Sequence, residues 1–286
     1  MNRPLTALAL ALTAALAAVV GACGDNLTHP TGPTPYESDA VTPLSCVPNL
    51  DGEIDADELL PATGIPVSYL VSAAGTTRAV DLTGAVDAGG KRVWDFTQPD
   101  TDPVATITAR AARAQWYGDR FPSDAVAVPL DAAGRIDGVY RHDADLGTFS
   151  ILGIASRDEA PPEGQTLWTY DAPVVLYRFP LGDGDAWTSV GEVRDGVVQG
   201  LPYAGRDTYQ IEVSGAGELV LPDVTFTQVL RVRTHLTAQP AVGASRSQWQ
   251  VSFLFECFGE VARATSRDGE TAADFTTAAE VRRFGL

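Results

Sequence analysis

Oxygen-bearing side chains are concentrated in one short segment, residues 49–58, with the sequence NLDGEIDADE. Carboxylate and amide oxygens are the ligands that calcium prefers, and a glycine among them permits the sharp turn that brings several oxygens to one ion. The segment supplies such a glycine and its flanking donors: Asn49, Asp51, Gly52, Asp55 and Glu58. Calcium binding is therefore the first chemistry that this spacing suggests.

The register of the segment resembles that of an EF-hand loop, with a glycine at the sixth position and a glutamate at the twelfth. The first position, which is usually aspartate, is occupied by Val47. Pro48 beside it is incompatible with an entering helix. We therefore favour an acidic surface turn followed by a short helical turn at residues 55–60, and predict no metal site. Calcium binding stays as the alternative.

Residues 141–145, with the sequence RHDAD, place His142 beside Asp143 and Asp145. A histidine and carboxylates can bind a metal or transfer protons. Neighbouring residues of a strand point to opposite faces, however, and these side chains are not expected to converge. A hairpin turn is the preferred interpretation.

Asp183 and Asp185 flank Gly184 and could also serve acid–base chemistry, but a Gly-Asp turn explains the same pattern. The sequence contains neither a G-x-S-x-G elbow nor a glycine-rich phosphate loop. We predict that the protein is not an enzyme and has no cofactor, with a hydrolase that uses carboxylates as an alternative.

The thiol of Cys23 follows Val20, Gly21 and Ala22 at the end of residues 4–22, which contain no charged side chain. An uncharged stretch of this length is typical of a secretory signal peptide and its cleavage region. The residues up to the cysteine resemble the lipobox of bacterial lipoproteins, in which small residues fit the signal peptidase and the cysteine carries diacylglycerol.

This resemblance implies a signal peptide at residues 1–22, a lipid on Cys23 and attachment to a membrane of the cell envelope. Gly24, in place of aspartate, favours the outer membrane. Residues 23–45 are rich in proline and poor in apolar side chains, so we expect a flexible tether. Secretion without a lipid and a retained membrane helix are the alternatives.

Cys46 and Cys257 are the only cysteines besides Cys23. Two thiols in an oxidising compartment are expected to form a disulfide, which here would connect the start of the folded domain to a late strand. Two separate buried thiols are the alternative.

The formal net charge of the chain is −17. An acidic surface repels nucleic acid and anionic headgroups, so neither is expected as a partner. A solvated acidic surface is the simplest interpretation of this charge.

From Cys46 onward, short segments rich in β-branched and aromatic residues alternate with glycine, aspartate and proline turns. This pattern predicts strands. They are expected within residues 67–74, 91–97, 104–112, 124–130, 135–142, 148–156, 173–181, 186–193, 206–222, 226–240 and 247–270. We expect two strands around residues 214–217, and we prefer a final strand to a helix at residues 272–284. The sequence thus predicts one all-β, antiparallel domain at residues 46–286, built as a curved half-barrel or as a sandwich.

Residues 176–187, 214–233 and 253–266 combine a Gly-Asp turn, long alternating strands and a glycine bend. Together they resemble a group of uncharacterised bacterial lipoproteins of the myxobacterial type and, more loosely, LolA-like half-barrel carriers. The resemblance covers residues 170–286. It implies a twisted antiparallel sheet with an apolar concave face and carries no catalytic residues.

Five aromatic side chains could line such a concave face: Tyr177, Phe179, Trp187, Phe253 and Phe255. We favour an ordinary closed core for these five side chains, with the concave binding face as the alternative. For the function, we expect a lipid-anchored envelope protein that binds or carries an amphiphile or a partner protein. A structural or interaction module at the outer membrane is the alternative class.

Overall fold

The computed structural model describes residues 46–99, 101–130 and 133–285. The predicted signal peptide, the lipidation site Cys23 and the tether lie outside these residues. Residues 45–286 form one compact unit. Within the described ranges, no helix has both the length and the apolar character needed to cross a membrane.

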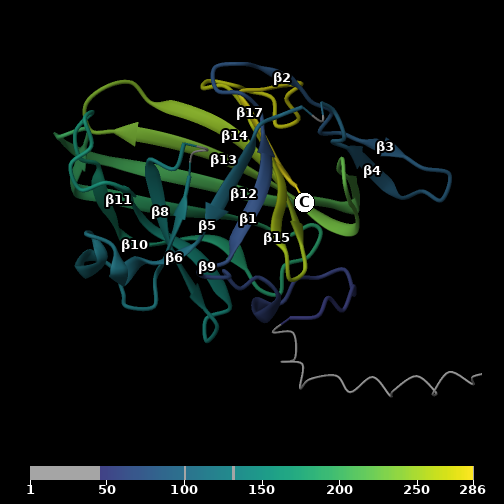
Figure 1. Ribbon diagram of the computed structural model, residues 1–286, viewed down its shortest axis with the longest axis horizontal. Coiled ribbons are helices and arrows are strands. Elements are labelled where there is room, and N and C mark those ends of the chain that lie inside the picture. The colour runs from purple at the N-terminus through teal and green to yellow at the C-terminus, as the bar shows by residue number, and fades with distance from the viewer. Residues whose placement is uncertain (1–45, 100, 131–132, 286) are drawn as a thin grey trace, which may run out of the picture. The chain divides into compact units, whose positions relative to one another are not determined.

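The domain is all-β, as predicted, and its strands carry the labels of Figure 1. The strands are β1 (Pro66–Val71), β2 (Arg78–Ala79), β3 (Ala85–Val86), β4 (Arg92–Asp95), β5 (Val104–Thr108), β6 (Arg110–Ala111), β7 (Val126–Pro129), β8 (Ile136–Asp143), β9 (Thr148–Ser156), β10 (Leu167–Arg178), β11 (Ala186–Val198), β12 (Leu201–Val220), β13 (Thr225–Pro240), β14 (Arg246–Phe255), β15 (Gly259–Thr265), β16 (Thr277–Ala278) and β17 (Glu280–Phe284). Short 3₁₀ helices are η2 (Ala56–Glu58), η3 (Ala112–Ala114) and η4 (Gly118–Arg120). The final segment forms strands rather than a helix, which confirms the preferred interpretation.

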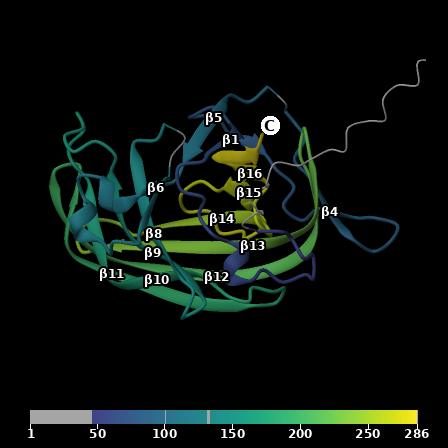
Figure 2. The same cartoon turned by 60° about the horizontal axis from the view of Figure 1, so that its bottom comes forward.

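The main sheet has the strand order β5-β1-β17-β15-β14-β13-β12-β11-β10-β9-β8-β7-β6. Only Ala109 separates β5 from β6 in the chain, yet β5 pairs with β1 and β6 pairs with β7. The single stretch of residues 104–111 therefore belongs to both ends of the sheet. The sheet curls back toward its own beginning (Figure 2). Of the two predicted architectures, the structure therefore has the half-barrel and not the sandwich.

The central strands are antiparallel, but β4 adds to the end of β12 in a parallel register. β12 runs without interruption through residues 214–217, so the two strands predicted there are one strand with irregular register. Gly217 serves close packing rather than a turn, because a Cβ at this position would lie 2.4 Å from the backbone oxygen of Arg92. The sequence pattern was misread because glycine in a strand and glycine in a turn look alike.

The two faces of the central strands are covered differently. Along β13, Val229 and Leu230 belong to separate apolar clusters on opposite faces. On the face that includes Leu230, Tyr140 of β8 lies within electrostatic reach of Arg263 of β15. Since β8 and β15 are far apart in the strand order, their side chains meet across the curve of the sheet. We call this concave face the inner face and the opposite one the outer face.

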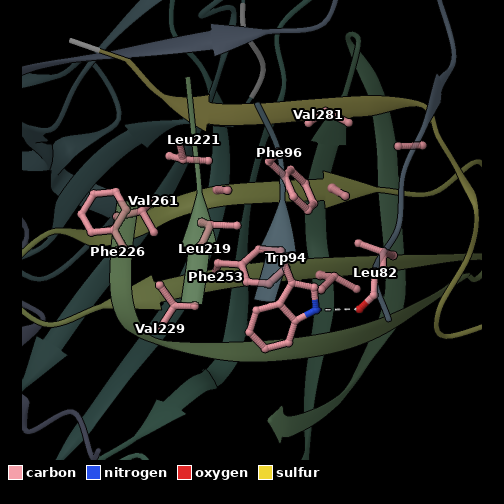
Figure 3. Packing of buried hydrophobic residues seen from close by; sticks show 14 of the residues in the cluster. Leu82, Trp94, Phe96, Leu219, Leu221, Phe226, Val229, Phe253, Val261 and Val281 are labelled. Atoms are coloured by element: carbon pink, nitrogen blue, oxygen red, sulfur yellow. Dashed lines mark hydrogen bonds between the residues drawn. The ribbon is translucent and has the colours of Figure 1, made fainter. Parts of the chain in front are cut away.

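The outer face of β12–β15 is sealed by the segment that contains β3 and β4 (Figure 3). Trp94 is fully buried there, and its Nε1 donates a hydrogen bond to the backbone oxygen of Leu82 at 3.0 Å. Phe253 packs edge-on against both Trp94 and Phe96, with ring centroids 5.1 and 5.2 Å away. This dense packing is the main apolar core of the domain.

A buried ion-pair network fixes the same covering segment to the last strand. Nη2 of Arg283 in β17 lies 2.6 Å from Oδ2 of Asp102, whose other oxygen is paired with Arg78. Nη1 of Arg283 donates to the backbone oxygen of Phe96 at 2.8 Å. Both charged side chains of the central pair are almost completely buried, so each depends on the other for compensation.

The first described residues, 46–60, pack against one end of the inner face. Ile54 exchanges two backbone hydrogen bonds with Leu181, both at 2.9 Å, and its side chain joins the inner apolar cluster. Cys46 is bonded to Cys257, as predicted, and the two Cα atoms are 5.6 Å apart. The disulfide thus holds this segment beside the turn between β14 and β15.

Candidate functional site

The inner face carries an unusual number of aromatic side chains that keep part of their surface accessible. They come from strands β1 and β8–β12 and are half-buried. Tyr140, Trp168, Tyr177, Trp187 and Tyr203 pack against the inner cluster. Phe149 stacks on Tyr140 and Tyr177, and the ring of Tyr69 lies 5.8 Å from the guanidinium of Arg282. Core side chains on the outer face, such as Trp94 and Phe253, are in contrast fully buried. The alternation of strand residues places these aromatic groups on one continuous concave wall.

Part of this wall is a stack of three rings on neighbouring strands. Phe149 lies between Tyr140 and Tyr177, with centroid distances of 5.3 and 5.8 Å and interplanar angles of 9° and 15°. Further along the wall, Trp168 packs against Tyr203 at 5.4 Å. Such rings offer large apolar contact areas together with hydroxyl groups that can form hydrogen bonds.

Burial raises the pKa of both Tyr69 and Tyr140 to about 12, and it raises the pKa of Tyr177 further. Each of these phenols also senses the charges of Glu260 and Arg263. The tyrosines come from separate parts of the sheet, so the charged groups of β15 lie where their side chains converge. The phenols remain protonated near neutral pH and can donate hydrogen bonds.

The charged groups form a small cluster where β15 and β17 pair. Arg263 and Arg282 are directly opposite each other in register. Arg263 lies 3.5 Å from both Glu260 and Glu280, and Arg282 lies 3.4 Å from Glu280. Burial lowers the pKa of Arg282, and the neighbouring Arg263 adds to this effect. The cluster is balanced in charge and gives one side of the aromatic wall a polar end.

A second polar group on the inner face consists of Asp207 and the tyrosines around it. The hydroxyl of Tyr170 donates a hydrogen bond to Oδ2 of Asp207 at 2.6 Å and lies 3.3 Å from the hydroxyl of Tyr209. Oδ1 of Asp207 is buried, and among the described residues it has no hydrogen-bond partner. Burial raises the pKa of Asp207, and the bond from Tyr170 opposes this rise only in part.

The raised pKa predicts how Asp207 affects stability as the pH changes. A carboxyl whose pKa is higher in the folded state contributes stability below its unfolded pKa of about 3.9, and this contribution is lost as the pH rises through the folded pKa. As the pH is raised from about 4 to about 8, we expect the free energy of unfolding of Asp207→Asn to increase relative to that of the wild type. Urea unfolding at both pH values measures this change. Asp195→Asn, at an exposed position, is the control. If the free energy of unfolding depended on pH in the same way for the wild type and Asp207→Asn, the expectation would be contradicted.

The acidic segment 49–58 forms turns, as the preferred interpretation describes. Oδ1 of Asn49 accepts from the amide of Asp51 at 2.9 Å, and Oδ1 of Asp51 accepts from the amide of Glu53 at 3.0 Å. Oε2 of Glu58 accepts from the amide of Asp55 at 2.9 Å, at the start of η2. Over the described part of the chain, no cluster of three or more histidine, cysteine, aspartate or glutamate side chains could hold a metal ion.

The other candidate groups also stay apart. Nε2 of His142 lies 2.7 Å from the backbone oxygen of Ala56, where it supports the N-terminal segment. Asp143 caps the hairpin turn by accepting from the amide of Leu146 at 3.1 Å. Asp185 accepts from the amide of Gly182 at 2.9 Å in its own turn. The turn interpretations describe these residues correctly.

The five aromatic residues that could line one concave face are divided between the two faces. Tyr177, Phe179 and Trp187 lie on the inner face, whereas Phe253 and Phe255 are buried in the outer core. The alternative of one shared face is excluded. Two-residue alternation alone does not establish the facing direction of β14 relative to β10 and β11. Each group does follow the two-residue alternation of its own strand.

Sequence reasoning missed the inner-face tyrosines other than Tyr177, as well as Asp207 and the pair Arg263 and Arg282. Only one signal could have indicated them: Asp207, Tyr209 and Ile211 alternate along β12, so a carboxylate occupies a position in line with inward-facing residues. No protein family model matches the chain, and neither a curated protein nor a solved structure matches it.

Proposed function

We propose that this protein is a lipid-anchored, non-catalytic binding protein of the cell envelope that holds an amphiphile on its inner face. The observation that supports the proposal most strongly is the half-buried aromatic wall. A closed core would bury these rings, as the outer core buries Trp94. Apolar rings with accessible surface on a concave face are typical of binding sites for small apolar molecules.

The distribution of polarity favours an amphiphile over a purely apolar ligand. The apolar part of such a molecule would lie along the wall of Phe149, Trp168 and Leu236, where burial of its surface gives about 25 cal/mol per Å². The polar part would lie near Arg263 and Glu260, where donors and acceptors are both present. This arrangement is consistent with a carrier that resembles the LolA-like half-barrels.

We also propose that a lipid on Cys23 attaches the protein to the outer membrane. Nucleic acid is not among the partners that we propose. The disulfide between Cys46 and Cys257 fits an oxidising compartment. A structural or interaction module remains the second candidate. It is favoured by the extensive ordered sheet, and it would not require any ligand on the inner face.

A substitution on the inner face tests ligand binding. Leu236 and Thr237 are adjacent, half-buried residues of β13 whose side chains point to opposite faces. We expect Leu236→Glu to weaken binding of dansyl-undecanoic acid by about tenfold or more, because a carboxylate on the apolar wall opposes the ligand chain. Thr237→Glu, on the outer face, should bind like the wild type.

The tryptophans of the inner face make the measurement site-specific. Trp168 and Trp187 can transfer excitation energy to a dansyl group bound beside them, so tryptophan-excited dansyl emission reports the ligand on this face. Dodecanoate should displace the probe. Cooperative thermal unfolding of both variants confirms that they are folded. Absence of binding to the full-length wild type, or equal binding by both variants, would reject the proposal.

A further inference from the structure

The outer face of β11–β14 carries a groove that the amphiphile proposal does not involve. Its volume is about 390 Å³, within the range of about 300–1,000 Å³ that is usual for small-molecule sites. The residues that line it are Ala186, Trp187, Thr188, Gln210, Ile211, Glu212, Arg233 and Trp249. The groove thus combines an indole with hydrogen-bonding groups of several kinds.

The sheet register explains why these residues meet. Glu212 lies directly between Ala186 and Arg233 on the neighbouring strands. One step along, Gln210 lies between Thr188 and His235, and His235 is paired in turn with Trp249. Residues in register point to the same face, so two cross-strand rows project outward side by side.

Trp249 is held in place by its neighbours. The ring of His235 stacks on it with centroids 4.3 Å apart and an interplanar angle of 14°. Nδ1 of His235 in turn lies 3.1 Å from Oε1 of Gln210. A supported, half-buried ring at the side of a polar groove is a prepared contact surface, because little freedom is lost when a ligand packs on it.

The charges in the groove balance. Nη1 of Arg233 lies 3.6 Å from Oε2 of Glu212. Nε of Arg233 donates to Asp274 at 3.1 Å, beside the groove. A cationic ligand would be repelled by Arg233 and an anionic ligand by Glu212, so the groove favours neither. An uncharged ligand with both donors and acceptors can use all of these groups.

We propose that this groove binds a neutral saccharide. A pyranose ring has an apolar C–H face that can pack on the Trp249 indole. Its hydroxyl groups both donate and accept hydrogen bonds, which matches Glu212, Gln210 and Thr188 along the floor. The side chains that would contact the sugar, Glu212, Gln210, Thr188 and Trp249, alternate with the inner-face residues Trp187 and Ile211, so the protein would contact a sugar polymer and an amphiphile on opposite faces of the sheet.

Filling the groove tests this inference without disturbing the core. Thr188 is an exposed residue of β11 on the groove floor, and Thr188→Trp should block the space. Val190→Trp, two residues along the same face and also exposed, is the matched control. Isothermal titration of the full chain with maltotetraose, cellotetraose, chitotetraose and mannotetraose measures binding.

We expect at least one tetrasaccharide to bind the wild type and Val190→Trp equally, and Thr188→Trp to bind at least about tenfold more weakly. If no tetrasaccharide binds the wild type, or if Thr188→Trp binds as the wild type does, the inference is wrong. Binding of dansyl-undecanoic acid by both variants should be unchanged, so this result is independent of the amphiphile experiment.

Discussion

Replacement of Asp102 by alanine should lower the free energy of unfolding by about 3–5 kcal/mol, which is the usual cost of breaking a buried ion pair. The variant would leave Arg283, which is 1% exposed, without its carboxylate at 2.6 Å. Arg78 would lose the same partner. Since Arg283 lies in the last strand, loss of its buried carboxylate would weaken the contact between β17 and the covering segment.

Urea unfolding followed by tryptophan fluorescence measures this loss, because Trp94 reports the packing of the covering segment. Asp195→Ala, which removes an exposed carboxylate, should change stability by less than about 0.5 kcal/mol. Asp102→Ala combined with Arg283→Met should recover part of the loss, since the buried charge is then absent. Equal stability of Asp102→Ala and wild type would show that the pair contributes nothing.

Removal of the disulfide is the second change with a large expected effect. Cys46 and Cys257 are 211 positions apart in the chain. Closing a loop of this length stabilises the folded state by about 5 kcal/mol in the chain-entropy model, and measured losses of native disulfides are about 2–5 kcal/mol. We expect the double variant Cys46→Ser/Cys257→Ser to lose about 2–5 kcal/mol in its free energy of unfolding.

The loss should also have a local signature. The disulfide holds residues 46–60 against the inner face, where the amide of Cys257 donates to the backbone oxygen of Glu58 at 2.8 Å. Hydrogen exchange of the Ile54 and Cys257 amides should accelerate more than that of Val251, in the outer core. Reduction of the wild type should give the same pattern. Unchanged exchange at Ile54 would mean that packing alone retains the segment.

The sequence was a good guide to the strands because each long strand has its own two-residue alternation. The β13 segment shows this clearly, since Val229 and Leu230 go to opposite faces as their positions require. The sequence was a poor guide to contacts between strands. Tyr170 and Asp207 are 37 positions apart and meet only through the register of β10–β12.

The errors have the same origin. Gly217 looks like a turn residue because the segment that packs on it, around Arg92, is far away in the chain. Phe253 and Tyr177 could be placed on one face because alternation fixes the sides of a strand but not which side faces inward. The inner face therefore required the three-dimensional arrangement, whereas the disulfide followed from two remaining cysteines and the expected oxidising compartment.

The pairing of the first long strand with the last has a consequence for biosynthesis. β1 finds its partner β17 only after residues 280–284 have been made. A chain that emerges from its N-terminus therefore has β5 available beside β1 long before β17. Such long-range closure slows folding, so we expect the pairing of β1 with β17 to form more slowly than the hairpins between neighbouring strands.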